Sequence, residues 1–209
     1  MSADDNLENK FAKNSKLFPD VKNGHGTPTW CSLNWIADQL SDDSCFADAF
    51  KKAGDKIVAE LTRGDDPWHP DPLFMPVAFL YRHALELKLK TLIRKGMELK
   101  IIDLSESDIN NALGRHYLDT LWRQFRSIAV ARWPGANTKD LDETEKIVAE
   151  FHCLDISGEN LRYSHDKKGN KTTQRFPDSV DLSKFQETFE GAYGFLDGCE
   201  MDFDHCLEV

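Results

Sequence analysis

Apolar residues recur at steps of three and four along most of this chain, which is the period of an amphipathic helix. The pattern is widest over residues 72–96, where one apolar stripe comprises Val77, Leu80, Tyr81, Ala84, Leu87 and Leu92. Further helices are predicted at 27–40, 45–64, 105–113, 114–133, 140–155 and 180–207. No segment alternates as a strand does, and no repeat period is visible. The pattern predicts an all-α fold.

The helices are expected to form an antiparallel four-helix bundle with accessory N-terminal helices. Residues 1–27 are polar and without period, so we interpret them as a flexible arm, and residues 28–209 as a single helical domain. Gly96 is predicted to close the 72–96 helix. A line of small residues in the last helix, Gly191, Gly194 and Gly198, is expected to let a neighbouring helix approach closely.

Two sets of metal-ligand residue types occur, and neither has a standard spacing. The stretch DDPWHPDP (65–72) places acidic residues around His69, but its three prolines predict a stiff turn outside any helix. Cys199, His205 and Cys206 would be neighbours on the last helix, which is weak evidence for zinc. No metal and no other cofactor is therefore predicted.

Composition favours a soluble cytoplasmic protein. With 209 residues and 40% hydrophobic content, the chain is long enough for one full core. The N-terminus lacks the apolar run of a secretory signal, and the longest apolar run, MPVAFLY, is too short to cross a membrane. Five cysteines without framework spacing fit free thiols in a reducing compartment.

The net charge of −10 is unevenly distributed. From Asp178 onward there are five Asp, four Glu and one Lys, whereas basic residues gather in 87–96 and 165–175. A polyanion would meet those two basic surfaces and be repelled by the acidic last helix. The alternative is that both basic surfaces are only solvated faces.

The 72–96 helix carries a second stripe, of charged residues at successive four-residue steps: Arg82, Glu86 and Lys90. This spacing lets Glu86 pair with both cations. Because the helix is so apolar, part of the stripe is expected to be only half exposed, and buried charge requires pairing. A structural salt-bridge stripe is slightly favoured over a functional one.

Three segments of the sequence, taken in their order along the chain, resemble the segments of a known protein family. They are FLYRHALELKLKTLIRKG, then GRHYLDTLW, then LRYSHDKKGN (161–170) ahead of the last helix. Together they resemble the HEPN superfamily, and more closely its uncharacterised bacterial members with an "FLYRHALEL-LK" helix and an "FRYP"-like segment. The resemblance covers roughly residues 72–200.

The resemblance implies an antiparallel four-helix bundle, frequently a homodimer, that works in toxin–antitoxin, phage-defence or stress systems. Active members are metal-independent ribonucleases in which an arginine and a histidine, four to six residues apart, meet across two protomers. Such chemistry is physically sensible because RNA carries its own nucleophile, the 2′-hydroxyl. Histidine exchanges protons near neutral pH, and arginine matches phosphate oxygens in a bidentate fork.

The residues that match this expectation are Arg162 and His165, which we take as the candidate catalytic pair. Arg82 and Glu86 are candidates to orient that pair, and further candidates for orientation or RNA binding are Lys90, Tyr163, Lys167 and Lys168. The spacing differs from the family pattern, since two residues separate Arg162 from His165. In the alternative interpretation, Arg162 anchors the loop to acidic residues and Tyr163 packs into the bundle. His116 is expected to begin the helix that follows it.

Two classes of function remain open. One is an RNA-cleaving or RNA-binding effector of a defence or stress system. The other is a non-catalytic helical subunit that dimerises or docks a protein partner in a multi-subunit system. The cluster at Lys167, Lys168, Lys171 and Arg175 favours a polyanion, whereas the acidic last helix favours a protein partner.

Overall fold

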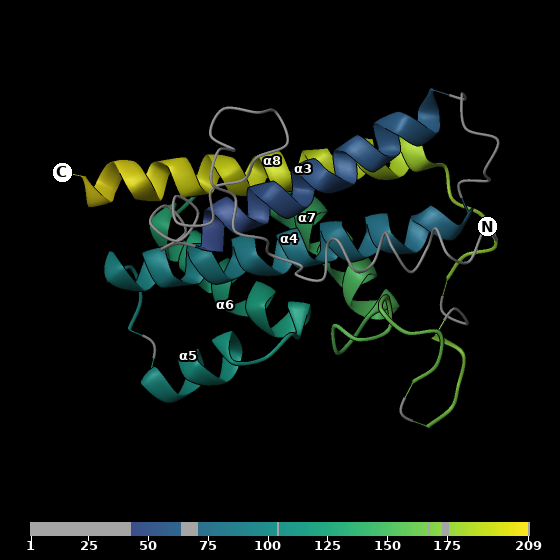
Figure 1. Ribbon diagram of the computed structural model, residues 1–209. Coiled ribbons are helices and arrows are strands. Elements are labelled where there is room, and N and C mark those ends of the chain that lie inside the picture. The colour runs from purple at the N-terminus through teal and green to yellow at the C-terminus, as the bar shows by residue number, and fades with distance from the viewer. Residues whose placement is uncertain (1–42, 64–70, 104, 167, 173–175, 209) are drawn as a thin grey trace, which may run out of the picture. The chain divides into compact units, whose positions relative to one another are not determined.

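The computed structural model describes residues 43–63, 71–103, 105–166, 168–172 and 176–208 (Figure 1). These residues all belong to the unit Gln39–Val209, because the chain divides after Asp38. The predicted arm 1–27, the predicted helix 27–40 and most of the DDPWHPDP turn lie outside the described residues. Within the described ranges the regular elements are helices, which confirms the prediction of an all-α bundle.

Six helices follow one another along this unit. They are α3 (Asp43–Thr62), α4 (Asp71–Glu98), α5 (Glu106–Leu113), α6 (Leu118–Arg132), α7 (Lys139–Leu154) and α8 (Leu182–Leu207). Each one coincides with a segment of helical period, to within a few residues at its ends. None of the described helices is both long and apolar enough to cross a membrane.

The expectation that prolines 67, 70 and 72 all lie outside helices is wrong for Pro72. α4 begins at Asp71 and therefore includes Pro72 in its first turn, and it also contains Pro76. The first amides of a helix have no partner within the helix, so Pro72, in the first turn, removes no hydrogen bond from α4.

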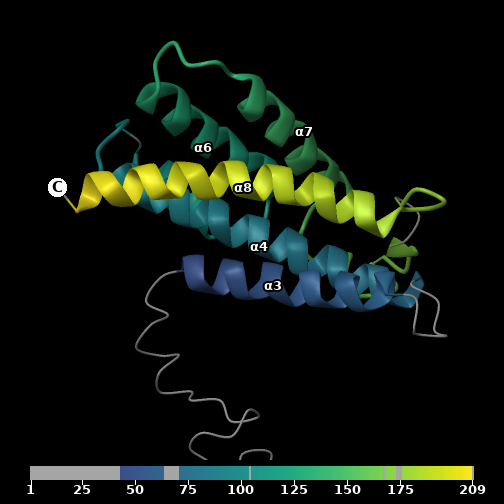
Figure 2. The same cartoon turned by 90° about the horizontal axis from the view of Figure 1, so that it is seen from above.

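α4 is the central helix, since it packs against α3, α6 and α8 (Figure 2). Its Tyr81 ring stacks on Phe189 of α8 with the ring centroids 4.2 Å apart. The prediction that Gly96 ends α4 is wrong, because Gly96 lies inside the helix. A Cβ atom there would be 2.6 Å from Ile128 of α6, so the missing side chain lets the two helices approach closely.

Contacts along the helices give their relative directions. α3 runs antiparallel to α4, because Asp48 reaches Lys88 while Asp55 reaches Tyr81. α6 and α7, and then α7 and α8, are also antiparallel neighbours, as Figure 2 shows. α4 and α8 run in the same direction, since Lys95 of α4 meets Asp204 near the end of α8. α5 returns the chain part of the way along α4 (Figure 1), so that α6 starts beside Arg82 and Glu86 of that helix.

The segment between α7 and α8 is the longest connection in the described unit. It begins at Asp155 and includes one isolated antiparallel bridge, between His165 and Lys171. This segment carries the LRYSHDKKGN sequence, and its first residues pack against α4 and the start of α6.

Candidate functional site

The centre of the site is a carboxylate, Glu86, buried on α4 with 1% of its surface exposed. Arg82 Nη1 and Lys90 Nζ each lie 2.9 Å from one of its carboxylate oxygens, so the predicted pairing with both cations is confirmed. The stripe is more deeply buried than expected, with Arg82 at 2% and Lys90 at 8%. Burial alone would raise the pKa of Glu86, but hydrogen bonds from Lys90, His116 and Arg82 lower it to about 2.

Arg82 also ties two other parts of the chain to α4. Its Nε donates to the main-chain oxygen of Asp155 at 3.1 Å, and its Nη2 donates to that of His116 at 2.6 Å. Asp155 is fully buried: its Oδ2 lies 3.4 Å from Arg82 Nε, and its Oδ1 accepts a hydrogen bond of 2.9 Å from the Asn160 amide. Arg82 therefore fixes the end of α7 and the residue that precedes the Tyr117 cap of α6.

His116 is the point at which this buried network reaches the surface. Its Nδ1 lies 2.7 Å from Glu86 Oε1, while 61% of its side chain is exposed. Because Glu86 is ionised and can only accept, Nδ1 is the ring nitrogen that donates to it, and Nε2 is left outside this hydrogen bond. His116 immediately precedes the α6 cap, as expected, but it is also an imidazole oriented by a buried carboxylate.

Gly158 brings the loop after α7 against the same residues. Its φ of +79° is in the left-handed region that favours glycine. A Cβ atom there would lie 3.2 Å from His116 Cβ and 3.3 Å from Arg82 Nη1. The carbonyl oxygen of Gly158 accepts a hydrogen bond of 3.0 Å from Arg162 Nε. Gly158 therefore lies beside both Arg162 and His116.

The candidate pair Arg162 and His165 is exposed on this loop. The Arg162 guanidinium lies 5.6 Å from the centroid of the Tyr163 ring. His165 Nδ1 lies 3.1 Å from Ser164 Oγ. Across the described residues, no hydrogen bond joins Arg162 to His165 or either of them to Arg82, Glu86 or Lys90.

The alternative interpretation of the loop is wrong in both of its parts. Tyr163 does not pack into the bundle, since 60% of it is exposed. In the described part of the chain, Arg162 contacts a backbone carbonyl and a ring rather than a carboxylate. The loop is held instead by Asp155 and Gly158, whose partners are on α4 and at the start of α6.

A pocket of about 710 Å³ lies on the loop beside Tyr163. His165, Lys168 and the start of the α7–α8 connection, from Ile156 to Asn160, also line it, whereas Arg162 is not among its lining residues. Lys167 lies outside the described residues. The loop therefore offers an aromatic ring, an imidazole and an amine to solvent within one hollow.

A second buried network lies on the opposite side of α4. Lys88 is 1% exposed, and its Nζ lies 2.7 Å from carboxylate oxygens of both Asp197 and Glu200 of α8. Burial alone would lower the pKa of Lys88, but hydrogen bonds to these two carboxylates raise it. Lys95 shares Glu200 at 2.7 Å, and Asp48 of α3 lies 3.2 Å from Lys88 Nζ. This network joins α3, α4 and α8.

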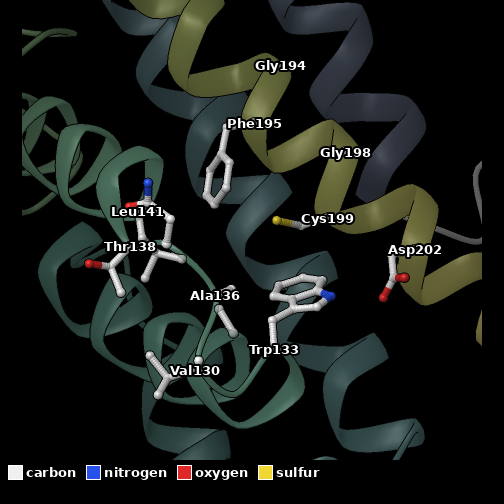
Figure 3. A pocket seen from close by; sticks show the side chains of 13 residues that line it. Val130, Trp133, Ala136, Thr138, Leu141, Gly194, Phe195, Gly198, Cys199 and Asp202 are labelled. Carbon is white, nitrogen blue, oxygen red and sulfur yellow. The ribbon is translucent and has the colours of Figure 1, made fainter.

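An apolar pocket of about 440 Å³ lies between the α6–α7 turn and α8 (Figure 3). Trp133, Leu141 and Phe195 form its walls, and Gly194 and Gly198 form part of its edge. The expected close neighbour of the α8 glycines is not found among the described residues, since nothing lies within 4 Å of a Cβ placed on any of the three.

The described residues contain no group of three or more metal-binding side chains. Of the cysteines considered for zinc, Cys206 accepts a hydrogen bond from Arg132. Cys199 is buried in the apolar pocket, and this burial raises the pKa of its thiol to about 12.

Sequence reasoning missed the parts of the site that are distant in the chain. His116 was expected to begin a helix, and Asp155 and Gly158 had no assigned role, because nothing in their local sequence predicts a meeting with Arg82 and Glu86. The one available signal was the GRH sequence before α6, which places a histidine at a helix start.

Comparison of the chain with protein-family models, with curated proteins and with solved structures finds no match. The functional argument therefore depends on the geometry of the site.

Proposed function

We propose that the chain is a HEPN-like effector of a bacterial defence or stress system that binds RNA and cleaves it without a metal ion. The observation that carries this proposal is the loop after α7, which is anchored by a buried ion network and presents Arg162, Tyr163 and His165 to solvent. A rigidly supported loop with exposed functional side chains is a common arrangement for a binding or catalytic site.

The side chains suit a nucleotide. Arg162 stays charged and matches phosphate oxygens, and the exposed Tyr163 ring provides a face on which a base can stack. The pocket of about 710 Å³ has a volume typical of small-ligand sites, and its lining contains the amine of Lys168 together with the carboxylates of Glu159 and Asp166. An imidazole near this surface supplies a group that exchanges protons near neutral pH.

The proposal includes a homodimer. The α8 face that carries Gly194, Gly198 and Met201 is exposed, with 73% of Met201 accessible. Glycine inside a helix costs about 1 kcal/mol relative to alanine, and close packing of a second helix would offset that cost. Sedimentation of the wild type at micromolar concentration should show a dimer, and Gly194→Leu should shift it towards a monomer.

The direct test is incubation of the purified chain with a tRNA pool in EDTA. The wild type should cleave RNA, and Arg162→Ala should reduce the rate by about 10²-fold because a cation beside the phosphate is lost. Arg123→Ala is the matched control, since Arg123 is an exposed arginine on α6 whose side chain is 70% accessible. An intact pool with no shift on a gel would exclude both cleavage and binding of this RNA pool.

The alternative function is a non-catalytic subunit that dimerises through the same α8 face. The apolar pocket beside that face favours it, because Trp133 and Phe195 form an apolar wall there. This alternative predicts a dimer that Gly194→Leu disrupts, together with intact RNA in every lane. Cleavage by the wild type would contradict it.

A further inference from the structure

We infer that His116, rather than His165, is the histidine that exchanges the proton during RNA cleavage, with Glu86 as its positioning residue and Arg162 as the neighbouring cation. This inference depends on the proposed RNA-cleaving function, of which it identifies the central residue. It rests on three observations: the hydrogen bond from His116 to a buried carboxylate, the exposure of the His116 side chain, and the position of Gly158.

The first observation separates His116 from the other described histidines. His116 alone among them hydrogen-bonds a buried carboxylate through a ring nitrogen, at 2.7 Å from Glu86 Oε1. His165 has only the Ser164 hydroxyl at 3.1 Å, on an exposed turn. His83 lies between two phenylalanine rings, where burial lowers its pKa, and His152 lies 3.7 Å from Asp119.

The orientation of His116 is fixed in both its backbone and its ring. Arg82 holds the main-chain oxygen of His116 at 2.6 Å, and Glu86 holds Nδ1. The remaining nitrogen, Nε2, belongs to a side chain that is 61% exposed. A base whose tautomer is set by a carboxylate and whose free nitrogen meets solvent is arranged for proton abstraction.

The charges around the site favour the protonated ring that forms in such a step. Arg82 and Lys90 offset the two buried carboxylates, Glu86 and Asp155, so the network is neutral while His116 is neutral. When Nε2 takes a proton, the new positive charge lies directly beside Glu86 Oε1. This is the role that a buried carboxylate plays behind a catalytic histidine.

Arg162 is joined to Gly158. Its Nε donates to the carbonyl oxygen of this glycine, and a Cβ atom on the glycine would lie 3.2 Å from His116 Cβ. Through Gly158, Arg162 is the cation that we assign to the phosphate at His116. The pocket beside Tyr163 would then hold the adjoining nucleotide.

The chemical step balances without any cofactor. His116 Nε2 accepts the proton of a 2′-hydroxyl, and the oxygen forms a bond to phosphorus. The P–O5′ bond breaks, and the departing 5′ oxygen takes a proton from water. The products are a 2′,3′-cyclic phosphate and a 5′-hydroxyl, and His116 returns its proton to solvent.

The test compares His116→Ala, His116→Asn, His165→Ala and the control His205→Ala on the tRNA pool in EDTA. His116→Ala should slow cleavage by about 10²-fold or more, since general-base catalysis contributes that much. His116→Asn should be equally slow although its amide can still donate to Glu86. His165→Ala should slow cleavage less than His116→Ala does, whereas the control His205→Ala should stay within about threefold of the wild type.

Thermal unfolding serves as the control for correct folding, and both His116 variants should melt within a few degrees of the wild type. If either His116 variant cleaves at the wild-type rate, or if His165→Ala alone abolishes cleavage, His116 is not the base, although the proposed function stands. If the wild type leaves RNA intact, both the proposed function and the assignment of His116 as the base are wrong. Products with 3′-hydroxyl ends would also exclude the mechanism.

Discussion

α4 carries a buried ion network on each of two opposite sides, and the two differ in what they leave at the surface. Glu86 and Lys88 are two positions apart, which turns their side chains by about 200° around the helix. On one side a carboxylate lies between the cations Arg82 and Lys90. On the other side a lysine lies among the carboxylates Asp197 and Glu200.

The two networks are therefore suited to different tasks. The network of Glu86 ends at the exposed imidazole of His116. The network of Lys88 ends at the carboxylates of Asp48 and Asp197, whose side chains are 61% and 45% exposed. The first is the network to which we assign proton exchange, whereas the second joins three helices. A buried ion network is therefore not by itself a sign of function, because the group that it presents to solvent determines what chemistry it can support.

The largest expected effect follows from removing the central acid. Glu86→Gln leaves Arg82 and Lys90 buried without a counter-charge, so the free energy of unfolding should fall by about 3–5 kcal/mol. Denaturant unfolding followed by circular dichroism measures it. A loss below about 1 kcal/mol would mean that the two cations find water or another partner.

Acid should weaken the same network. The pKa of Glu86 is lowered from 4.5 to about 2, so its contribution is fully present above pH 4.5 and is lost as the pH falls towards 2. The loss should approach about 3 kcal/mol, by the energy of a pKa shift of this size. Other carboxylates titrate in this window, so the measurement is the difference between wild type and Glu86→Gln across it. Parallel curves for the two proteins would contradict the prediction.

Comparison of two glycine substitutions measures the contact between the loop after α7 and the network of Glu86. Gly158→Ala should destabilise the chain by about 2 kcal/mol, because the methyl group meets both His116 and Arg82 in a left-handed backbone. Gly169→Ala is the matched control, since Gly169 has nearly the same φ, +84°, and nothing within 4 Å. Its loss should be about 1 kcal/mol. Equal losses in denaturant unfolding would show that backbone conformation alone sets the cost.

The smallest effect is expected on the other side of α4. Lys88→Met removes the central lysine, but Glu200 keeps Lys95, and the carboxylates of Asp48 and Asp197 already reach solvent. The free energy of unfolding should therefore change by only about 1 kcal/mol, in line with apolar replacement of buried ion pairs. If Lys88→Met costs as much as Glu86→Gln, the proposed difference between the two networks is wrong.

Much of the fold and one part of the site follow from local pattern. Each described helix was predicted because helical period is a property of nearby residues, and the pairing of Arg82, Glu86 and Lys90 was predicted because four-residue spacing places them on one face. The prediction that Gly96 ends α4 failed because glycine is also used where two helices touch, and local sequence does not separate these uses.

What the amino-acid sequence determined by itself is the set of helices and the charged stripe within α4, since both depend on residues a few positions apart. Only the tertiary structure decided that this stripe would hold His116, which is 30 positions from Glu86, and Asp155, which is 73 positions from Arg82. Contacts over such separations depend on how helices cross and how far α5 returns the chain, and these follow from packing of the whole core rather than from any short segment.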